Sequence, residues 1–351
     1  MVLEIRLTHI SKEQIMSKVK KPVLDIKNLA VEIKLDEGLL TPVRGVSFSI
    51  GEEETLGLVG ESGCGKSLTS KSILGINSKK IVRSGQILYT NDKDETIDLL
   101  AFKRTSKALR AIRGKEVSMI FQEPMTSFSP LFTVGNQISE AVRLHITKDR
   151  KQARELSVKM MERVGIADAD KRFDQYPHEF SGGMLQRALI ATSLICNPRL
   201  LIADEPTTAL DVTIQAQILE LMKELQVEYK MSILYITHDL GTVAAVCDRV
   251  AVMYLGRIVE TASCKDIFNN PLHPYTRGLI GSVHKIGSAK EELFSIEGTV
   301  PLAMNLEDKC SFYDRCTSRD EKMCSGKEPA LVEVRKDHFV ACYVAEQMKD
   351  K

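Results

Sequence analysis

The sequence predicts an α/β protein built around a parallel β-sheet, because short apolar runs alternate with helical patterns along the chain. Three of these runs, at 54–59, 199–203 and 232–237, are largely apolar, which is typical of parallel strands buried on both faces. Each run ends abruptly in glycine or in polar and charged residues. Because the carboxyl ends of parallel strands meet at one edge of a sheet, we expect a single ligand site there.

A glycine-rich loop follows the first run and fits the pattern G-x-x-x-x-G-K-[ST]. It comprises Gly60, Glu61, Ser62, Gly63, Cys64, Gly65, Lys66 and Ser67, and Leu68 in the following helix completes the expected nucleotide-binding set. In such a loop backbone N–H groups surround one phosphate chain, the lysine reaches the β- and γ-phosphates and the hydroxyl ligates Mg²⁺. A chance glycine-rich turn has a similar composition, but the motifs described below favour a phosphate loop.

Ionisable residues end the second and third runs. Asp204 fits the carboxylate that holds Mg²⁺ through water, and Glu205 fits the base that polarises an attacking water molecule. Taken alone, this pair is also compatible with a solvated turn at a strand end. His238 ends the third run and is either a structural histidine or a group beside the same phosphates.

Composition changes along the chain predict its organisation. Residues 23–50 alternate apolar with polar side chains, as in an antiparallel sheet that is half exposed to solvent, and residues 98–113 carry basic side chains at helical spacing. Charged amphipathic helices at about 130–185 predict a helical subdomain inserted into the α/β domain. We expect a lead-in at 1–21, a nucleotide-binding domain at 22–280 and a small C-terminal extension at 281–351.

Charge and hydropathy indicate where the protein works. The net charge of +1 provides no global attraction to nucleic acid or to anionic lipid. No apolar run approaches the roughly 18 residues that a membrane helix requires, and charges throughout the first residues argue against a signal peptide. We therefore expect a cytoplasmic protein that reaches a membrane only through a partner.

A further motif, Phe180-Ser181-Gly182-Gly183-Met184 followed by Leu185-Gln186-Arg187, resembles the signature of ABC transporter nucleotide-binding subunits. The resemblance extends from about Val23 to Leu279. Ser181, Gly182, Gly183 and Met184 begin a helix, where backbone N–H groups can hold the γ-phosphate. In this family two cassettes pack head to tail, so the signature of one chain acts on the ATP held by the phosphate loop of the other.

The resemblance assigns roles to individual residues. Gln122 matches the Q-loop glutamine that senses Mg²⁺ and water, Asp204 and Glu205 match the Walker B pair, and His238 matches the switch histidine. The stretch Thr208-Ala209-Leu210-Asp211 matches the D-loop. These matches imply an ATPase in which Ser67, Gln122 and Asp204 hold Mg²⁺ and Glu205, His238 and Gln122 take part in hydrolysis. Ile33 stands where cassettes usually place an aromatic ring under adenine.

Longer stretches resemble the oligopeptide and dipeptide importers within this family, namely 121–127, 176–184, 204–213 and 270–276. This branch implies peptide uptake with two permeases, a second cassette (as a heterodimer) and indirectly an external solute-binding protein, at the cytoplasmic face of the cell membrane. Importers of nickel or other small solutes share the same stretches and remain an alternative. A soluble ABC ATPase acting on ribosomes or DNA is a remoter alternative, because the chain holds one cassette and is nearly neutral.

Four of the eight cysteines cluster near the C-terminus, at Cys310, Cys316, Cys324 and Cys342. Clusters of four thiolates select iron–sulfur clusters or zinc, and the absence of a C-x2-C pair argues against an ordinary zinc ribbon. The extension of some peptide-importer ATPases, which this tail resembles, holds a [4Fe–4S] cluster. The residues 305–309 depart from the usual proline- and glycine-bearing segment. Iron–sulfur, zinc and reduced thiols without a metal therefore remain open.

Overall fold

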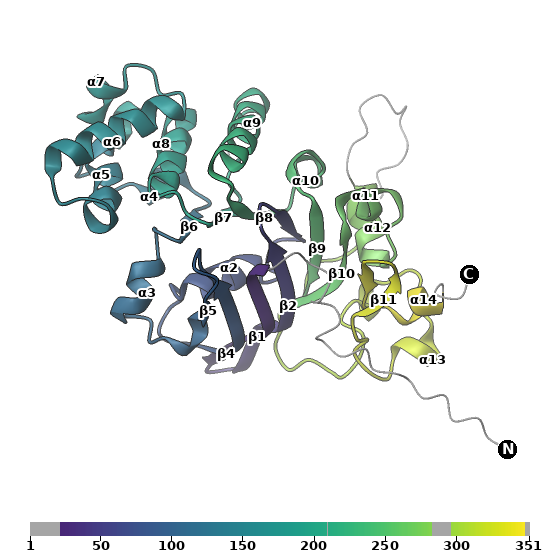
Figure 1. Ribbon diagram of the computed structural model, residues 1–351. Coiled ribbons are helices and arrows are strands. Elements are labelled where there is room, and N and C mark those ends of the chain that lie inside the picture. The colour runs from purple at the N-terminus through teal and green to yellow at the C-terminus, as the bar shows by residue number, and fades with distance from the viewer. Residues whose placement is uncertain (1–21, 209, 283–295, 348–351) are drawn as a thin grey trace.

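The computed structural model describes residues 22–208, 210–282 and 296–347, which form two β-sheets surrounded by helices (Figure 1). The expected lead-in at 1–21 lies outside the described residues, as does Ala209 of the D-loop stretch. The alternation of strands and helices confirms the predicted α/β class.

The smaller sheet is antiparallel, as the alternating pattern predicts, and has the strand order β2-β1-β4-β5. Its strands are β1 (Pro22–Leu35), β2 (Gly38–Gly51), β4 (Ile81–Thr90) and β5 (Thr96–Asp98). Strand β1 is irregular in its first half, where Asn28 has a φ of 51° and the register with β2 shifts between Ile26 and Leu29. This β-bulge keeps both halves of β1 in the same sheet.

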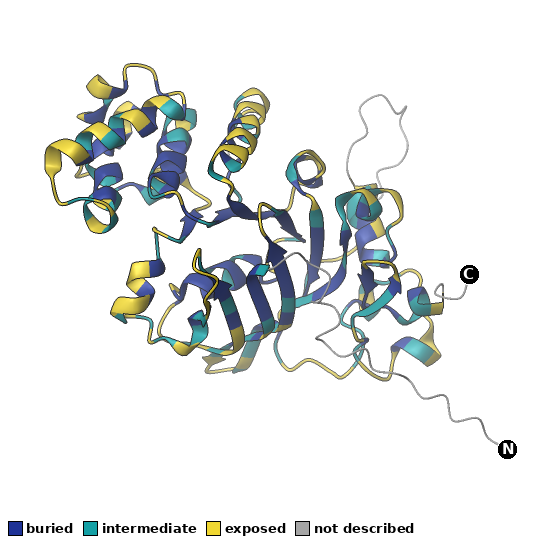
Figure 2. Ribbon diagram, in the orientation of Figure 1, coloured by how far each residue is buried: buried dark blue, intermediate teal, exposed yellow. Residues whose placement is uncertain are grey.

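The larger sheet has eight strands in the order β11-β12-β10-β9-β3-β8-β7-β6. Its strands are β3 (Thr55–Val59), β6 (Val117–Ile120), β7 (Leu200–Asp204), β8 (Ser232–Thr237), β9 (Arg249–Tyr254), β10 (Arg257–Ser263), β11 (Val332–Arg335) and β12 (His338–Val340). The five from β9 to β6 are parallel, and the other three continue the sheet in antiparallel pairing. Every residue of β3, β7 and β8 is buried, as expected for central strands (Figure 2).

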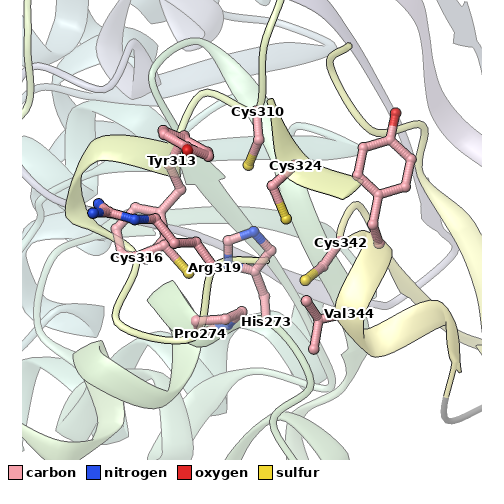
Figure 3. A pocket seen from close by; sticks show the side chains of 11 residues that line it. His273, Pro274, Cys310, Tyr313, Cys316, Arg319, Cys324, Cys342 and Val344 are labelled. Atoms are coloured by element: carbon pink, nitrogen blue, oxygen red, sulfur yellow. The ribbon is translucent and has the colours of Figure 1, made fainter. Parts of the chain in front are cut away.

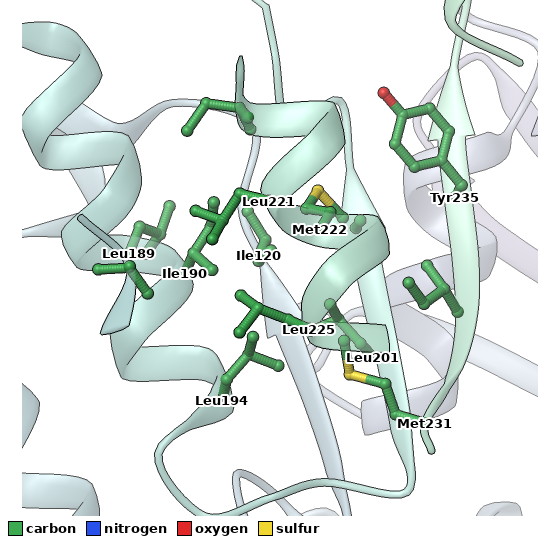
Figure 4. Packing of buried hydrophobic residues seen from close by; sticks show 14 of the residues in the cluster. Ile120, Leu189, Ile190, Leu194, Leu201, Leu221, Met222, Leu225, Met231 and Tyr235 are labelled. Carbon is green, nitrogen blue, oxygen red and sulfur yellow. The ribbon is translucent and has the colours of Figure 1, made fainter. Parts of the chain in front are cut away.

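Helices flank the larger sheet and cover its apolar residues. They are α2 (Lys66–Leu74), α9 (Val212–Tyr229), α10 (Leu240–Val246), α11 (Cys264–Asn269) and α12 (Pro274–Gly281). Figure 4 shows Leu221, Met222 and Leu225 of α9 among the buried side chains of α8 and the sheet. Complete burial of a side chain such as Leu225 contributes about 1.5–3 kcal/mol. Asp211 caps α9 by accepting the Ile214 N–H at 3.0 Å.

A helical body occupies the predicted insertion. It consists of α4 (Pro124–Ser127), α5 (Val134–His145), α6 (Arg150–Arg163), α7 (Ala169–Phe173), η2 (Pro177–Glu179) and α8 (Gly182–Leu194). Before it, the helical spacing at 98–113 gives only the short η1 (Leu99–Ala101) and α3 (Lys107–Ile112). The helix begins late because the Ser106 hydroxyl caps it by accepting the Leu109 N–H.

The C-terminal segment contains elements that the sequence analysis did not identify. They are η3 (Tyr313–Arg315), α13 (Glu321–Cys324), β11, β12 and α14 (Tyr343–Glu346). Strand β12 pairs with β10 through Glu260 opposite Val340 and Thr261 opposite Phe339. The end of the chain therefore belongs to the same sheet as the phosphate loop strand.

Candidate nucleotide-binding site

The phosphate loop connects β3 to α2 and depends on glycine at two crowded positions. Gly60 has a φ of 154°, and a Cβ there would lie 2.1 Å from the Met253 carbonyl oxygen. Gly65 has a φ of 107°, and its Cβ would lie 2.3 Å from the Pro42 carbonyl oxygen. Only glycine tolerates both the conformation and the close backbone approach, so these positions fix the path of the loop.

Lys66 is the first residue of α2, and its side chain turns back over the loop. Its ammonium group donates to the carbonyl oxygens of Gly60 at 2.6 Å and Glu61 at 3.0 Å, and the residue is 6% exposed. A buried ammonium group held by two neutral carbonyls keeps its positive charge available to an anion. The position suits a phosphate chain that enters the loop.

Asp204, the last residue of β7, is joined to α2 by two serine hydroxyls. Ser67 Oγ donates to one carboxylate oxygen and Ser70 Oγ to the other, each at 3.2 Å. Burial of Asp204 raises its pKa, and the two hydroxyl hydrogen bonds act in the opposite direction. The structure thus brings together the hydroxyl and the carboxylate that the sequence predicts as magnesium ligands. Ser70 was not anticipated, although its position one helical turn after Ser67 was a usable signal.

Glu205 is the centre of a second cluster formed by the ends of three parallel strands. Its carboxylate accepts hydrogen bonds from Gln122 Nε2 at 2.8 Å and Thr208 Oγ at 3.0 Å, and His238 Nδ1 lies 3.0 Å from its other oxygen. Burial alone would raise the pKa of Glu205, but the hydrogen bonds with His238 and Thr208 outweigh it and hold the pKa below its ordinary value. The cluster therefore keeps Glu205 as a carboxylate, which is the form that accepts a proton.

Three of the four residues in this cluster were predicted site residues that are far apart in the sequence. Gln122 follows β6, Glu205 follows β7 and His238 follows β8. Thr208 was noted only as part of a D-loop match and had no predicted contact with Glu205. Thr208 follows Glu205 by three residues, so a tight turn brings its hydroxyl within hydrogen-bond distance of the Glu205 carboxylate.

The signature residues lie elsewhere in the chain. Ser181 caps α8 by accepting the Met184 N–H at 3.3 Å, and a Cβ added at Gly182 would meet no atom within 4 Å. Helix α8 belongs to the helical body, apart from α2 (Figure 1), whereas the phosphate loop connects β3 to α2. Within the residues that the structure describes, Ser181, Gly182, Gly183 and Met184 are therefore not part of the phosphate loop site. Ile33 lies on β1, paired with Leu40 and Ile81.

The four C-terminal cysteines line one pocket together with His273 and residues of η3 and α14 (Figure 3). All four are free thiols, and burial raises the pKa of Cys310 to about 12. Across 22–208, 210–282 and 296–347, no three His, Cys, Asp or Glu side chains are grouped so that they could hold a metal ion. The predicted cysteines are thus brought to one pocket, but not to the spacing of a single-ion site.

Comparisons with known proteins agree with this architecture. The family model for the ABC transporter matches residues 43–208, and that for the oligopeptide/dipeptide transporter C-terminal region matches residues 259–324. The dipeptide transport ATP-binding protein DppD of Bacillus subtilis is 48% identical over 328 residues, which are 93% of this chain and 95% of that protein. A putative peptide import ATP-binding protein of Brucella melitensis is 47% identical over 92% of this chain and 97% of its own length.

Solved structures share the fold. An ATP-binding cassette in a dimeric post-hydrolysis state with ADP and phosphate superimposes with a TM-score of 0.60 at 23% identity, over 69% of this chain and 98% of that chain. CbiO1 of Clostridium perfringens, part of an ABC transporter complex, gives a TM-score of 0.58 at 25% identity, over 72% of this chain and 92% of its own.

The fold and the strand-end cluster define an ATP-binding cassette with the residues of an ATPase. With relatives near 47% identity over almost its whole length, the chain belongs to the ATP-binding proteins of ABC transporters, in the branch that carries the oligopeptide/dipeptide C-terminal region. None of the helices in the described part of the chain has the length and apolar character needed to cross a membrane.

Proposed function

We propose that this chain is the ATPase subunit of an importer that takes up dipeptides or oligopeptides through partner permeases. The observation that carries the proposal is the match of residues 259–324 to the oligopeptide/dipeptide transporter C-terminal region, which lies beyond the ATPase motifs. Relatives named for dipeptide, oligopeptide and peptide transport support it. ATP is then the substrate of the cassette, and its hydrolysis drives the permeases between inward- and outward-facing states.

In the proposed reaction the phosphate loop from Gly60 to Ser67 and Leu68 bind the nucleotide, and Lys66 balances the charge of its β- and γ-phosphates. Ser67, Asp204 and Gln122 would hold Mg²⁺, which supplies charge stabilisation between the phosphates when bound. The paired Ser67 hydroxyl and Asp204 carboxylate, 3.2 Å apart, fit that ion as oxygen ligands.

Glu205 is the proposed general base. Its carboxylate accepts the proton of the attacking water, while Gln122, Thr208 and His238 orient it through the hydrogen bonds described above. His238 is 58% exposed at its side chain, so it is accessible to the γ-phosphate of a bound nucleotide. The residues after β6, β7 and β8 would thus together position the attacking water against the γ-phosphate.

The proposed active unit contains two cassettes. Because Ser181 to Met184 lie at the N-terminus of α8 and outside the phosphate loop site, they would bind the γ-phosphate of the nucleotide held by a partner cassette. Peptide importers commonly combine two different cassettes, so we propose a heterodimer on two permeases at the cytoplasmic face of the cell membrane. An external solute-binding protein would deliver the peptide.

The test is affinity purification of the tagged chain from detergent-solubilised membranes, with co-purifying chains identified by mass spectrometry. Two permeases and a second cassette are the expected result, and peptide-dependent ATPase activity of the recovered complex would establish the cargo. Stimulation by nickel or another small solute in place of peptides would favour the alternative importer. Recovery with ribosomes or DNA would contradict the assignment as an importer subunit but not the assignment as an ATPase.

We also propose that the cysteine pocket holds a [4Fe–4S] cluster. The donor set fits, because such a cluster is bound by four cysteine thiolates, and all four line the same pocket. Zinc bound by the same thiolates is the alternative occupant. Protein purified without oxygen should be brown, with iron and sulfide near stoichiometric, whereas colourless protein containing only zinc would contradict the cluster.

A further inference from the structure

The C-terminal segment contacts the phosphate loop through one ion pair. Arg315, the last residue of η3, donates through Nη1 to one carboxylate oxygen of Glu61 at 2.7 Å and through Nη2 to the other at 3.0 Å. The Arg315 side chain is 8% exposed and that of Glu61 is 27% exposed. This two-pronged geometry is the most directional form of an arginine–carboxylate contact. It joins residues that are 254 positions apart.

Arg315 is itself held in place on several sides. Its Nε donates to the Glu297 carbonyl at 2.8 Å, and its Nη2 donates to the Gly298 carbonyl at 3.0 Å. The guanidinium carbon also lies 5.7 Å from the centre of the Tyr254 ring, within the range of a cation–π contact. A side chain fixed in this way loses little further freedom when it binds Glu61, so the pair is preorganised.

The backbone of Glu61 has a second anchor outside the loop. Its N–H donates to the hydroxyl of Tyr275 at 2.8 Å, and the Tyr275 ring packs on Tyr254 and Phe312 with centroids 4.7 and 5.5 Å away. The carbonyl of Glu61 accepts a hydrogen bond from Lys66 at 3.0 Å. Glu61 therefore connects a rigid aromatic support and Arg315 to the lysine that faces the phosphates.

The negative charge of Glu61 makes its pairing with Arg315 relevant to ATP binding. A carboxylate within a loop that must accept a polyphosphate repels the ligand when it is unpaired, because like charges disfavour each other at short range. Arg315 neutralises this carboxylate and holds it by both oxygens. We propose that Arg315 is a positioning residue for ATP binding, through which the C-terminal segment controls the phosphate loop. The effect rests on the proposed ATPase function of the cassette and is the same whichever solute is transported.

The test compares Mg·ATP affinity of full-length variants by isothermal titration calorimetry. Arg315→Met keeps the length of the side chain but leaves Glu61 unpaired, and we expect its Kd to rise about tenfold, which corresponds to about 1.4 kcal/mol. Adding Glu61→Gln removes the repelling charge and should restore the Kd to within about threefold of the original. Glu61→Gln alone removes the same charge and reports what the carboxylate contributes directly to ATP binding.

A matched control distinguishes the effect of the Arg315–Glu61 pair on ATP affinity from a general loosening of the C-terminal segment. Glu328 pairs with Arg44 of β2 at 3.0 Å, which joins the same segment to the cassette away from Glu61. Glu328→Gln should leave the Kd unchanged. An unchanged Kd in Arg315→Met, or a weakened one that Glu61→Gln does not restore, would overturn the proposal.

Two further outcomes would contradict the proposed role of Arg315, and neither depends on whether Arg315→Met folds. A tenfold weaker Kd in Glu61→Gln alone would mean that the carboxylate itself serves ATP binding. An equal loss of affinity in Glu328→Gln would mean that any loosening of the segment has the same effect. Arg315→Lys retains the charge without the paired geometry, so its Kd should fall between those of the unaltered chain and Arg315→Met.

Discussion

Replacement of the buried Glu260 by alanine should strongly destabilise the protein. Glu260 lies on β10 with 0% exposure, and one of its oxygens is 2.7 Å from Nε2 of His338 on β12. The same carboxylate accepts the backbone N–H groups of Leu272 at 2.7 Å and His273 at 2.9 Å, just before α12. One side chain therefore joins the edge of the sheet, the added strand and the start of a helix.

The expected magnitude follows from the donors that the substitution leaves without an acceptor. Two backbone N–H groups and one imidazole N–H would remain buried, and each unsatisfied donor costs about 1–3 kcal/mol. Partial relaxation and entry of water keep the loss near the lower end of that sum. We therefore expect Glu260→Ala to lower the free energy of unfolding by about 3–5 kcal/mol.

The assay is urea-induced unfolding followed by circular dichroism. The matched control is Glu260→Gln, which retains one acceptor oxygen and should lose less than half as much stability. The pKa of Glu260 is lowered, because hydrogen bonds from His338 and from the backbone outweigh the effect of burial. Its contribution is therefore complete above the ordinary glutamate pKa and is lost as the pH falls through the lower folded-state value, a dependence that Glu260→Gln should remove. A midpoint and slope in Glu260→Ala equal to those of the unaltered chain would refute this reasoning.

Three further predictions concern the helical body, the base and a helix cap. Gly135→Ala places a methyl group 2.2 Å from the Phe173 ring, so stability should fall by about 1–3 kcal/mol in thermal unfolding and recover when Phe173→Leu is added. Glu205→Gln should lower phosphate release at least about 100-fold while ATP still binds and holds two cassettes together in size-exclusion chromatography; unchanged turnover would contradict the assigned base. Asp211→Ala removes the acceptor of the Ile214 N–H and should reduce stability by about 1 kcal/mol in urea unfolding, whereas Asp211→Asn should not.

The strand-end cluster was predictable from sequence because its parts are local motifs with a common geometric rule. Gln122, Glu205 and His238 each follow a buried strand, and adjacent parallel strands place such residues at one edge. The helix cap at Asp211 was predictable for the same reason, since capping depends on neighbours three residues away.

The contacts of the C-terminal segment were not predictable in this way. Strands β11 and β12 have only four and three residues, which is too short for a recognisable periodic pattern. Strand β12 also pairs with a strand about 80 positions earlier in the sequence. Arg315 has no motif that points to Glu61, because the contact arises from tertiary packing of η3 against Tyr254. The bulge at Asn28 was not predicted, because the alternating pattern at 23–50 does not show where the register of a strand shifts.

The pairing of β12 with β10 has a consequence for the chain while it is being synthesised. His338 follows Glu260 by 78 residues, so the edge of the sheet stays open until β12 has also left the ribosome. During that interval β10 presents an unpaired edge to other nascent chains, but an inward-pointing carboxylate lies in its middle. A carboxylate at such a place opposes pairing with a foreign strand, because that strand would bury the charge without the imidazole of His338, which is costly. We therefore expect Glu260 to disfavour aggregation while the sheet is incomplete and to stabilise the sheet once β12 has paired with β10.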